Sequence, residues 1–168
     1  MAKKTVYIET TIPSMYFNTR SARILVTRGE QTKKWWDAQR QNYELFTSAA
    51  VIEELSRGAH PSRDDKIHLL AAVPELLITR ELHEIAAFYC RQKMMPRDTR
   101  GDALHLAVAS YYKCDILLTW NCKHLANIRK LGHISRLNAL LGLAVPELLT
   151  PFQLMERGEI HEEERRND

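Results

Sequence analysis

Hydrophobic and polar positions along the chain form two alternating patterns, each typical of one kind of secondary structure. Short runs rich in β-branched, aliphatic and aromatic residues predict β-strands. The predicted strands cover residues 5–8, 43–47, 76–79, 116–119 and 147–150. Between them lie longer segments in which apolar residues recur at helical spacing. The predicted helices cover residues 24–39, 48–56, 81–93, 123–131 and 135–141, and further helices begin near 62, 102 and 150.

Capping and turn residues mark the ends of several predicted elements. Ser48 is a suitable N-cap for the helix that follows the second strand. Thr150 and Gln153 have the spacing of a capping box at the start of the last helix. Residues 9–14 form a predicted polar turn, because Pro13 cannot continue the first strand.

Strands and helices alternate along the whole chain, without an internal repeat or a linker. This alternation predicts an α/β fold, a three-layer α/β/α sandwich in which helices cover both faces of a central parallel sheet. At 168 residues the chain is long enough for one domain with one core. We assign residues 1–155 to this domain and residues 156–168 to a charged tail, expected to be a frayed helix or disordered.

The composition is that of an ordinary soluble protein, with 45% hydrophobic and 27% charged residues. No apolar run is long enough to cross a membrane, and the first residues lack the apolar segment of a signal peptide, so we expect a cytoplasmic protein. The three cysteines, Cys90, Cys114 and Cys122, lack CxxC spacing. We expect free thiols rather than disulfide partners or zinc ligands.

Charge is unevenly distributed along the chain. The formal net charge is +3, but residues 156–168 contain six acidic residues and three arginines. The tail therefore carries −3, which leaves +6 on residues 1–155. A mildly basic body is compatible with a nucleic-acid partner, and it is equally compatible with ordinary surface charge.

Four oxygen-bearing side chains are predicted to lie at one edge of the sheet. In parallel α/β sheets, ligands bind at the carboxyl ends of the strands, where the following helices begin. Glu9 directly follows the first strand, and Glu54 lies in the second turn of the helix after the second strand. Asp102 begins an apolar helix, and Asn121 lies two residues beyond the strand that ends at Thr119.

Each of these residues also has a purely structural interpretation. Asp102 has the spacing to complete a capping box with Thr99. Glu9 is consistent with a turn residue, Glu53 and Glu54 with a solvated helix face, and Asn121 with an N-cap for the next helix. The functional interpretation depends on the four side chains occurring together.

Several carboxylates in one place point to a metal ion, because crowded carboxylates repel one another unless a cation neutralises them. Oxygen ligands favour Mg²⁺ or Mn²⁺ over zinc. Such an ion on a mildly basic protein suggests phosphate-ester chemistry. Motifs of other chemistries do not occur: the sequence has no GxGxxG, no Walker lysine, no GxSxG elbow and no Asp-x-Asp after the first strand.

Four blocks of the sequence resemble the motifs of PIN-domain ribonucleases, with the closest likeness to the VapC-type toxins of toxin–antitoxin pairs. In chain order the blocks are YIETTIPS, SAAVIEEL, GDALHLAVAS and DILLTWNCKHLAN. The resemblance covers about residues 4–155. It implies a parallel sheet between helical layers and endonucleolytic cleavage of RNA that depends on Mg²⁺ or Mn²⁺.

The resemblance also implies catalytic and metal-binding roles by motif position. Glu9 takes the place of the family's first aspartate, Glu54 that of the second acid and Asp102 that of the third. Asn121 falls where many members have a fourth aspartate, and Thr119 matches the polar residue before it. Glu9 is one methylene longer than aspartate and Asn121 lacks a negative charge, so we expect one well-held ion rather than two.

Other residues are candidates for contacts with substrate or with the metal ligands: Thr10, Arg100, His105, Thr119 and Lys123. His105, one turn beyond Asp102, is either a packed histidine or a functional one. Trp35 and Trp36 either stack on RNA bases or pack as one core and one surface residue. Glu53 and Glu54 point about 100° apart on a helix, and motif position favours Glu54.

The leading hypothesis is therefore a metal-dependent endoribonuclease that hydrolyses RNA with a metal-activated water. The resemblance adds a protein antitoxin and a homodimer as expected partners. The alternative is a PIN-fold RNA-binding or interaction module whose catalysis is weakened by Glu9 and Asn121. A phosphohydrolase acting on small molecules is less favoured, because a glycine-rich phosphate loop is missing.

Overall fold

A five-stranded parallel sheet with the order β3-β2-β1-β4-β5 forms the centre of the computed structural model, which describes residues 2–92 and 101–167. The strands are β1 (Thr5–Ile8), β2 (Glu44–Ser48), β3 (Glu75–Leu76), β4 (Ile116–Leu118) and β5 (Glu147–Leu149). β1 is the central strand and pairs with β2 on one side and β4 on the other. Because every pairing is parallel, the carboxyl ends of all five strands lie at one edge.

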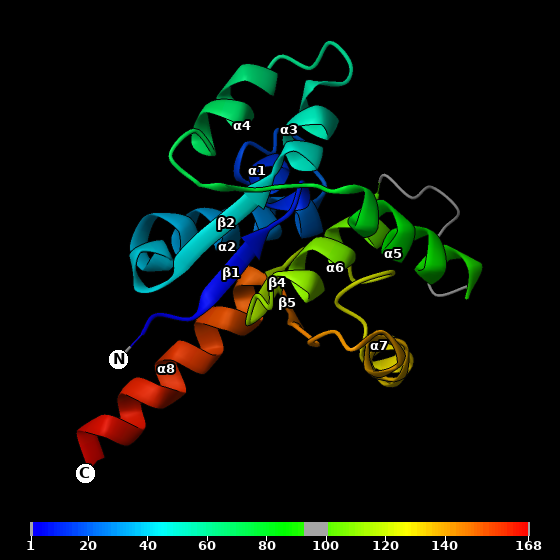
Figure 1. Cartoon of the computed structure of the whole chain (residues 1–168). Helices are drawn as coiled ribbons and strands as arrows, with labels where there is room; N and C mark the ends of the chain where they lie inside the picture. Colours follow the sequence, from blue (N-terminus) through cyan, green and yellow to red (C-terminus); the bar gives the residue numbers. More distant parts are fainter. Residues whose placement is uncertain (1, 93–100, 168) are drawn as a thin grey trace.

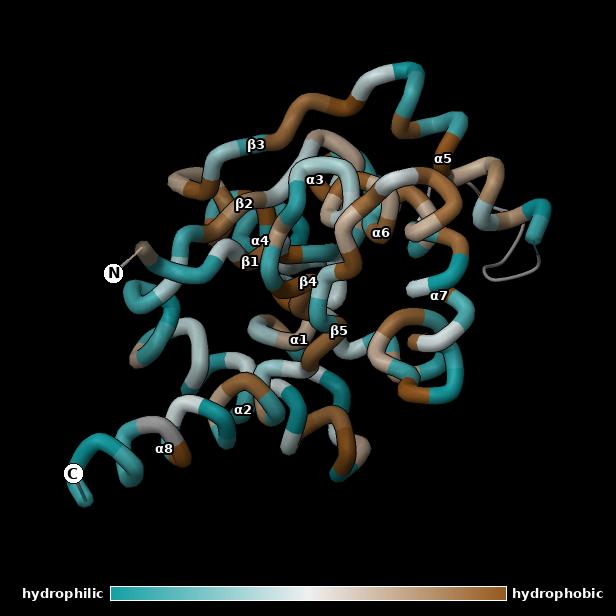
Figure 2. Tube along the Cα trace, turned by 60° about the horizontal axis from the view of Figure 1, so that its bottom comes forward, coloured by the Kyte–Doolittle hydropathy of each residue, from teal (hydrophilic) through white to brown (hydrophobic). Residues whose placement is uncertain are grey.

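Helices cover both faces of the sheet, which confirms the predicted three-layer sandwich (Figure 1). They are α1 (Thr11–Tyr16), α2 (Arg23–Gln39), α3 (Ala49–Ser56), α4 (Arg63–Leu69), α5 (Arg80–Arg91), α6 (Asp102–Tyr111), α7 (Ile128–Leu141) and α8 (Pro151–Asn167), with a 3-10 turn at Arg40–Asn42. α4, α1, α2 and α8 contact one another in a row. α5 packs along α6, on the other side of the strands from α2 and α8 (Figure 2).

The core explains why Asp102 is held in place. Val6, Tyr7 and Ile8 of β1 are fully buried. α6 is buried from Ala103 to Ser110, as expected for a helix that is apolar on all sides. Its body is enclosed by the sheet and α5, so its first residue is fixed at the carboxyl edge of the strands.

Two predicted segments are wrong in their local structure. Residues 9–14 do not form a simple turn, because they contain most of α1. Pro13 lies in the first turn of that helix, where a backbone N–H has no helical partner to lose. In place of helices at 123–131 and 135–141, a turn precedes one continuous helix, α7, whose N-cap Asn127 accepts a hydrogen bond from the backbone of Arg129.

Other local predictions can be compared directly with the structure. The capping box is confirmed, since the backbone N–H of Thr150 donates to Gln153 Oε1 (3.0 Å) and that of Gln153 donates to Thr150 Oγ1 (3.2 Å). The third strand is shorter than predicted, and the charged C-terminal segment continues α8 to Asn167.

The three cysteines all lie in described residues and are free, as predicted. Across residues 2–92 and 101–167, no helix is long and apolar enough to span a membrane.

Candidate active site

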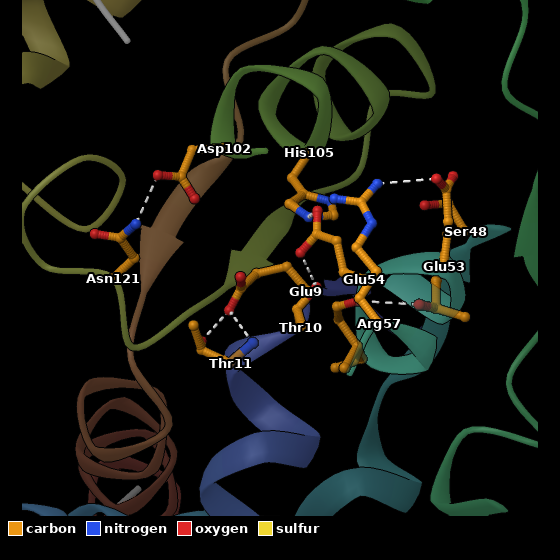
Figure 3. A network of polar contacts seen from close by, with 12 residues as sticks. Glu9, Thr10, Thr11, Ser48, Glu53, Glu54, Arg57, Asp102, His105 and Asn121 are labelled. Carbon is orange, nitrogen blue, oxygen red and sulfur yellow. Dashed lines mark hydrogen bonds and ion pairs between the residues drawn. The ribbon is translucent and has the colours of Figure 1, made fainter. Parts of the chain in front are cut away.

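Three acidic side chains from separate parts of the chain meet at the carboxyl edge of the sheet (Figure 3). Glu9 follows β1, Glu54 projects from α3, and Asp102 is the first residue of α6. Each is close enough to affect the ionisation of another, since the charge of Asp102 acts on Glu9 and the charge of Glu54 acts on Asp102. The structure therefore gathers these three side chains into one acidic cluster, defined as Glu9, Glu54 and Asp102.

Glu9 is the most deeply buried member of the acidic cluster, with 2% of its surface exposed. Its Oε1 accepts hydrogen bonds from the backbone N–H of Thr11 (2.9 Å) and from the Thr11 hydroxyl. Burial raises the pKa of Glu9 to about 7, and the Asp102 carboxylate adds to this rise while His105 and Thr11 oppose it. A pKa raised in this way means that the positive charge near Glu9 is too weak to offset the effect of burial on its ionised form.

Glu54 is held by two donors, one at each oxygen. The Thr10 hydroxyl donates to Oε2 (2.6 Å), and Nε2 of His105 lies 2.9 Å from Oε1. Burial works to raise the pKa of Glu54, but these hydrogen bonds and the charge of His105 outweigh it, and the pKa lies below its usual value. Glu53 points elsewhere and forms an exposed ion pair with Arg57. Of the two adjacent glutamates, only Glu54 faces the acidic cluster.

A buried hydrogen-bond chain orients His105. Its Nδ1 lies 2.9 Å from the hydroxyl of Tyr7, which in turn lies 2.8 Å from the hydroxyl of Ser48. Because the ionised Glu54 can only accept, Nε2 of His105 must donate to it. Burial disfavours the charged form of His105, but the Glu54 carboxylate raises the pKa of His105 above its usual value. His105 is therefore a hydrogen-bonded partner of the acidic cluster, with 1% of its surface exposed.

Asn121 holds Asp102 through its amide group. Nδ2 of Asn121 donates to Asp102 Oδ2 (2.7 Å), and Oδ1 of Asn121 accepts from the backbone N–H of His124 (3.0 Å). Burial raises the pKa of Asp102 above its usual value, against the opposing charges of His105 and His124. In this arrangement Asn121 positions Asp102 and caps the following turn, and its oxygen is turned toward His124.

The remaining candidate residues are Thr119, Lys123, Arg100 and the two tryptophans, and they differ in burial and in position. The Thr119 hydroxyl is fully buried and accepts from the backbone N–H of Asn121 (2.9 Å). Lys123 is exposed in the following turn. Arg100, like the potential capping residue Thr99, lies outside the described residues. Both alternatives considered for Trp35 and Trp36 are wrong. Both residues belong to the core, with 0% and 4% of their surfaces exposed, so they neither stack on RNA bases nor divide into one core and one surface residue.

Three residues of this site were not identified from the sequence: Tyr7, Thr11 and Ser48. One sequence signal existed for Tyr7, because a tyrosine hydroxyl in a buried central strand requires a polar partner. Ser48 occupies the predicted N-cap position of α3, but its side chain makes no capping hydrogen bond and pairs with Tyr7 instead.

The donor set fits a hard divalent ion in its chemistry, although the cluster is not a preformed cage. Within residues 2–92 and 101–167, no group of three or more His, Cys, Asp or Glu side chains is arranged to hold a metal. Both oxygens of Glu54 are already hydrogen-bonded, whereas no described residue donates to Oε2 of Glu9 or Oδ1 of Asp102. Burial, which is deep for Glu9 and partial for Asp102, raises the pKa values of both carboxyl groups, and a divalent cation at this place would supply the positive charge that they lack.

Comparison with known proteins agrees with this fold. The PIN domain family model matches residues 23–130, a region that includes Glu54, Asp102 and Asn121 and begins after Glu9. Among solved structures, the crystal structure of Mycobacterium tuberculosis VapC20, a sarcin-ricin loop cleaving toxin, is similar in fold, with a TM-score of 0.51 and 20% identity over 67% of this chain and 86% of that chain. No curated protein matches the sequence significantly. Since the family model spans more than half of the sequence, the chain belongs to the PIN domain family.

Proposed function

We propose that this PIN domain is an endoribonuclease that depends on Mg²⁺ or Mn²⁺. The observation that carries the proposal is the acidic cluster at the carboxyl edge of the parallel sheet (Figure 3). Two of its three carboxyl groups have pKa values raised by burial, and a divalent cation would favour their ionised forms. The net positive charge of the chain outside its tail suits a polyanionic substrate.

The side chains of the acidic cluster would have distinct tasks. Glu9 and Asp102 would hold the ion, because each keeps one oxygen that no described residue bonds. When bound, the ion would lower the pKa of a water molecule and stabilise charge on the phosphate oxygens. Glu54, kept ionised by Thr10 and His105, adds negative charge and can accept a hydrogen bond from a water molecule.

Neighbouring polar residues would keep this arrangement rigid. Thr11 fixes one oxygen of Glu9, and Asn121 fixes one oxygen of Asp102. Such fixed orientation favours catalysis, because the reacting groups need no reorganisation when the substrate binds. Asn121 therefore supports a ligand in this proposal, and the site holds one ion rather than two.

For the biological role, we propose a toxin of a VapC-type toxin–antitoxin pair. The four sequence blocks and the similarity in fold to VapC20, which is itself described as a toxin, support this role. It implies a cytoplasmic RNA substrate, a homodimer, and an antitoxin that places a basic side chain in the acidic cluster. A gene for a small DNA-binding protein directly adjacent to the gene for this chain is the expected observation.

Cleavage of single-stranded RNA by the wild-type protein and by Asp102→Asn, with Mg²⁺, Mn²⁺ or EDTA, tests the proposed activity. The wild type should cleave with either ion and not in EDTA. Asp102→Asn should lose at least about 100-fold in rate, with an unchanged or raised Tm because the repulsion between its charge and the neighbouring carboxylates is removed. Glu54→Gln should also lose activity, whereas the matched control Glu53→Gln, an exposed residue next in sequence, should keep it.

Wild-type cleavage rates in the Asp102→Asn variant would contradict the assignment of the site. A wild-type protein that binds RNA without metal-dependent cleavage, and whose affinity is unaffected by Glu54→Ala, would instead support the alternative of a catalytically weakened binding module.

A further inference from the structure

A long basic stretch of the chain adjoins the acidic cluster. Residues 116–146 contain no aspartate or glutamate. The same stretch contains two histidines and four residues with a permanent positive charge: Lys123, Arg129, Lys130 and Arg136. It runs from β4 through the Asn121 turn into α7, so part of its positive charge lies beside the site.

Hydrogen bonds connect this stretch to Asp102. Nζ of Lys130, in the first turn of α7, lies 3.4 Å from Nδ1 of His124. The backbone N–H of His124 donates to Oδ1 of Asn121 (3.0 Å), whose amide donates to Asp102 (2.7 Å). The turn that carries His124 is therefore attached to the acidic cluster, and Lys130 is attached to that turn.

The pKa shifts of Lys130 and Asp102 also indicate that the basic residues lie close to Asp102. Partial burial lowers the pKa of Lys130, the Asp102 carboxylate opposes this shift, and the Lys123 ammonium adds to it. The charge of His124 acts on Asp102. Lys123, His124 and Lys130 thus form a basic group next to Asp102.

The Lys130 ammonium donates to the His124 ring, and the Lys123 ammonium adds a second positive charge close to it, so the arrangement attracts an anion. Asp102 is the neighbouring carboxylate. Asp102 carries one negative charge against the two positive charges of Lys123 and Lys130, so the basic group keeps a net positive charge for a second anion even without a metal ion.

We propose that Lys123, His124 and Lys130 bind a phosphate group of the RNA strand adjacent to the phosphate that is cleaved. The inference rests on the proposed ribonuclease function and adds a direction to it: the strand passes over the Asp102 side of the cluster and follows the start of α7. Lysine suits this task, since its ammonium is a point charge on a flexible stem that contacts phosphate without reading the base.

The test is the salt dependence of RNA binding, measured by fluorescence anisotropy with a labelled single-stranded RNA in EDTA, where no metal-dependent cleavage occurs. The proteins are the wild type, Lys123→Gln, Lys130→Gln, the double variant and the control Lys113→Gln. Lys113 is an exposed lysine of equal charge that lies just before β4, at the opposite edge of the sheet from the site.

Each lysine in contact with phosphate contributes about 0.7 to the slope of log affinity against log salt for single-stranded nucleic acid. Each single variant should therefore have a slope shallower by about 0.7, and should bind about fivefold more weakly at about 0.1 M salt than the wild type, with the difference vanishing near about 1 M. Lys113→Gln should match the wild type.

An unchanged slope in the double variant would overturn the inference. An unchanged slope together with a changed Tm or a changed response to Mn²⁺ would mean that Lys130 only neutralises Asp102 and does not contact RNA. In either case, wild-type protein that still cleaves RNA with Mg²⁺ would leave the proposed function standing. Wild-type protein that neither binds nor cleaves RNA would overturn both.

Discussion

Replacing Glu9 by glutamine should stabilise the metal-free protein above neutral pH. The Glu9 carboxyl group is 2% exposed, and burial raises its pKa from 4.5 to about 7. Glutamine keeps the oxygen that accepts from Thr11 and removes the charge that burial disfavours. Because glutamine has nearly the same size and shape as glutamate, the substitution measures the free-energy cost of burying the charge of Glu9 without changing its packing.

The sign and size of the effect follow from the linkage between proton binding and folding. Because the folded pKa of Glu9 lies above the unfolded value of 4.5, its protonated form contributes stability that is fully present below pH 4.5 and is lost as the pH rises through about 7. At about 1.4 kcal/mol per pH unit, this pKa difference corresponds to about 3–4 kcal/mol. For a chain of this length, that is roughly 6–16 °C in Tm.

The assay is thermal unfolding in EDTA followed by circular dichroism. Glu9→Gln should unfold at a higher temperature than the wild type at about pH 8, and the difference should shrink toward about pH 5. Mn²⁺ should raise the Tm of the wild type and have a smaller effect on the variant, because the ion binds the folded wild type more tightly. Glu53→Gln, with the same chemical change at an exposed position, should show neither effect. Equal Tm values for Glu9→Gln and wild type at about pH 8 would refute the reasoning.

Three further outcomes are expected. Tyr7→Phe removes the hydroxyl beside Nδ1 of His105, so kcat should fall with KM unchanged in steady-state RNA cleavage, and urea unfolding should show a loss of about 1–3 kcal/mol. Leu106→Ala, at a fully buried position of α6, should lower the free energy of unfolding by about 2–5 kcal/mol in the same urea assay. Gln153→Ala breaks one half of the capping box with Thr150 and should cost about 1 kcal/mol, measured as a lower Tm.

The layer architecture was predictable because it follows from local patterns. Short aliphatic runs form strands and intervening segments with helical spacing form helices, and because at least one helix separates each pair of consecutive strands, the strands form a parallel sheet. α6 is the clearest example, since a helix without a polar face has to be enclosed. The capping box of Thr150 and Gln153 was predictable for the same reason, because both partners lie within one turn.

The local failures occur where tertiary contacts outweigh the sequence pattern. α1 was predicted as a turn, but Ile12 is fully buried there, and this packing favours a helix despite Pro13. In α7, helical structure continues through Gly132, although the sequence suggested a break in this region. Glycine costs about 1 kcal/mol in a helix, which packing of Ile134 and Leu137 into the core can offset.

By itself, the sequence determined the order of the elements, the parallel sheet and the edge at which Glu9, Glu54 and Asp102 would lie, because these follow from periodicity and from the direction of parallel strands. Only the tertiary structure decided how each side chain is used. It directs both oxygens of Glu54 toward Thr10 and His105, and the amide of Asn121 toward Asp102. It also brings Lys130 close to Asp102, so that the two charges interact. The physical reason is that these groups are far apart in the chain, His105 and Glu54 by 51 positions. Their hydrogen bonds depend on rotamers and burial, which only the packed core determines.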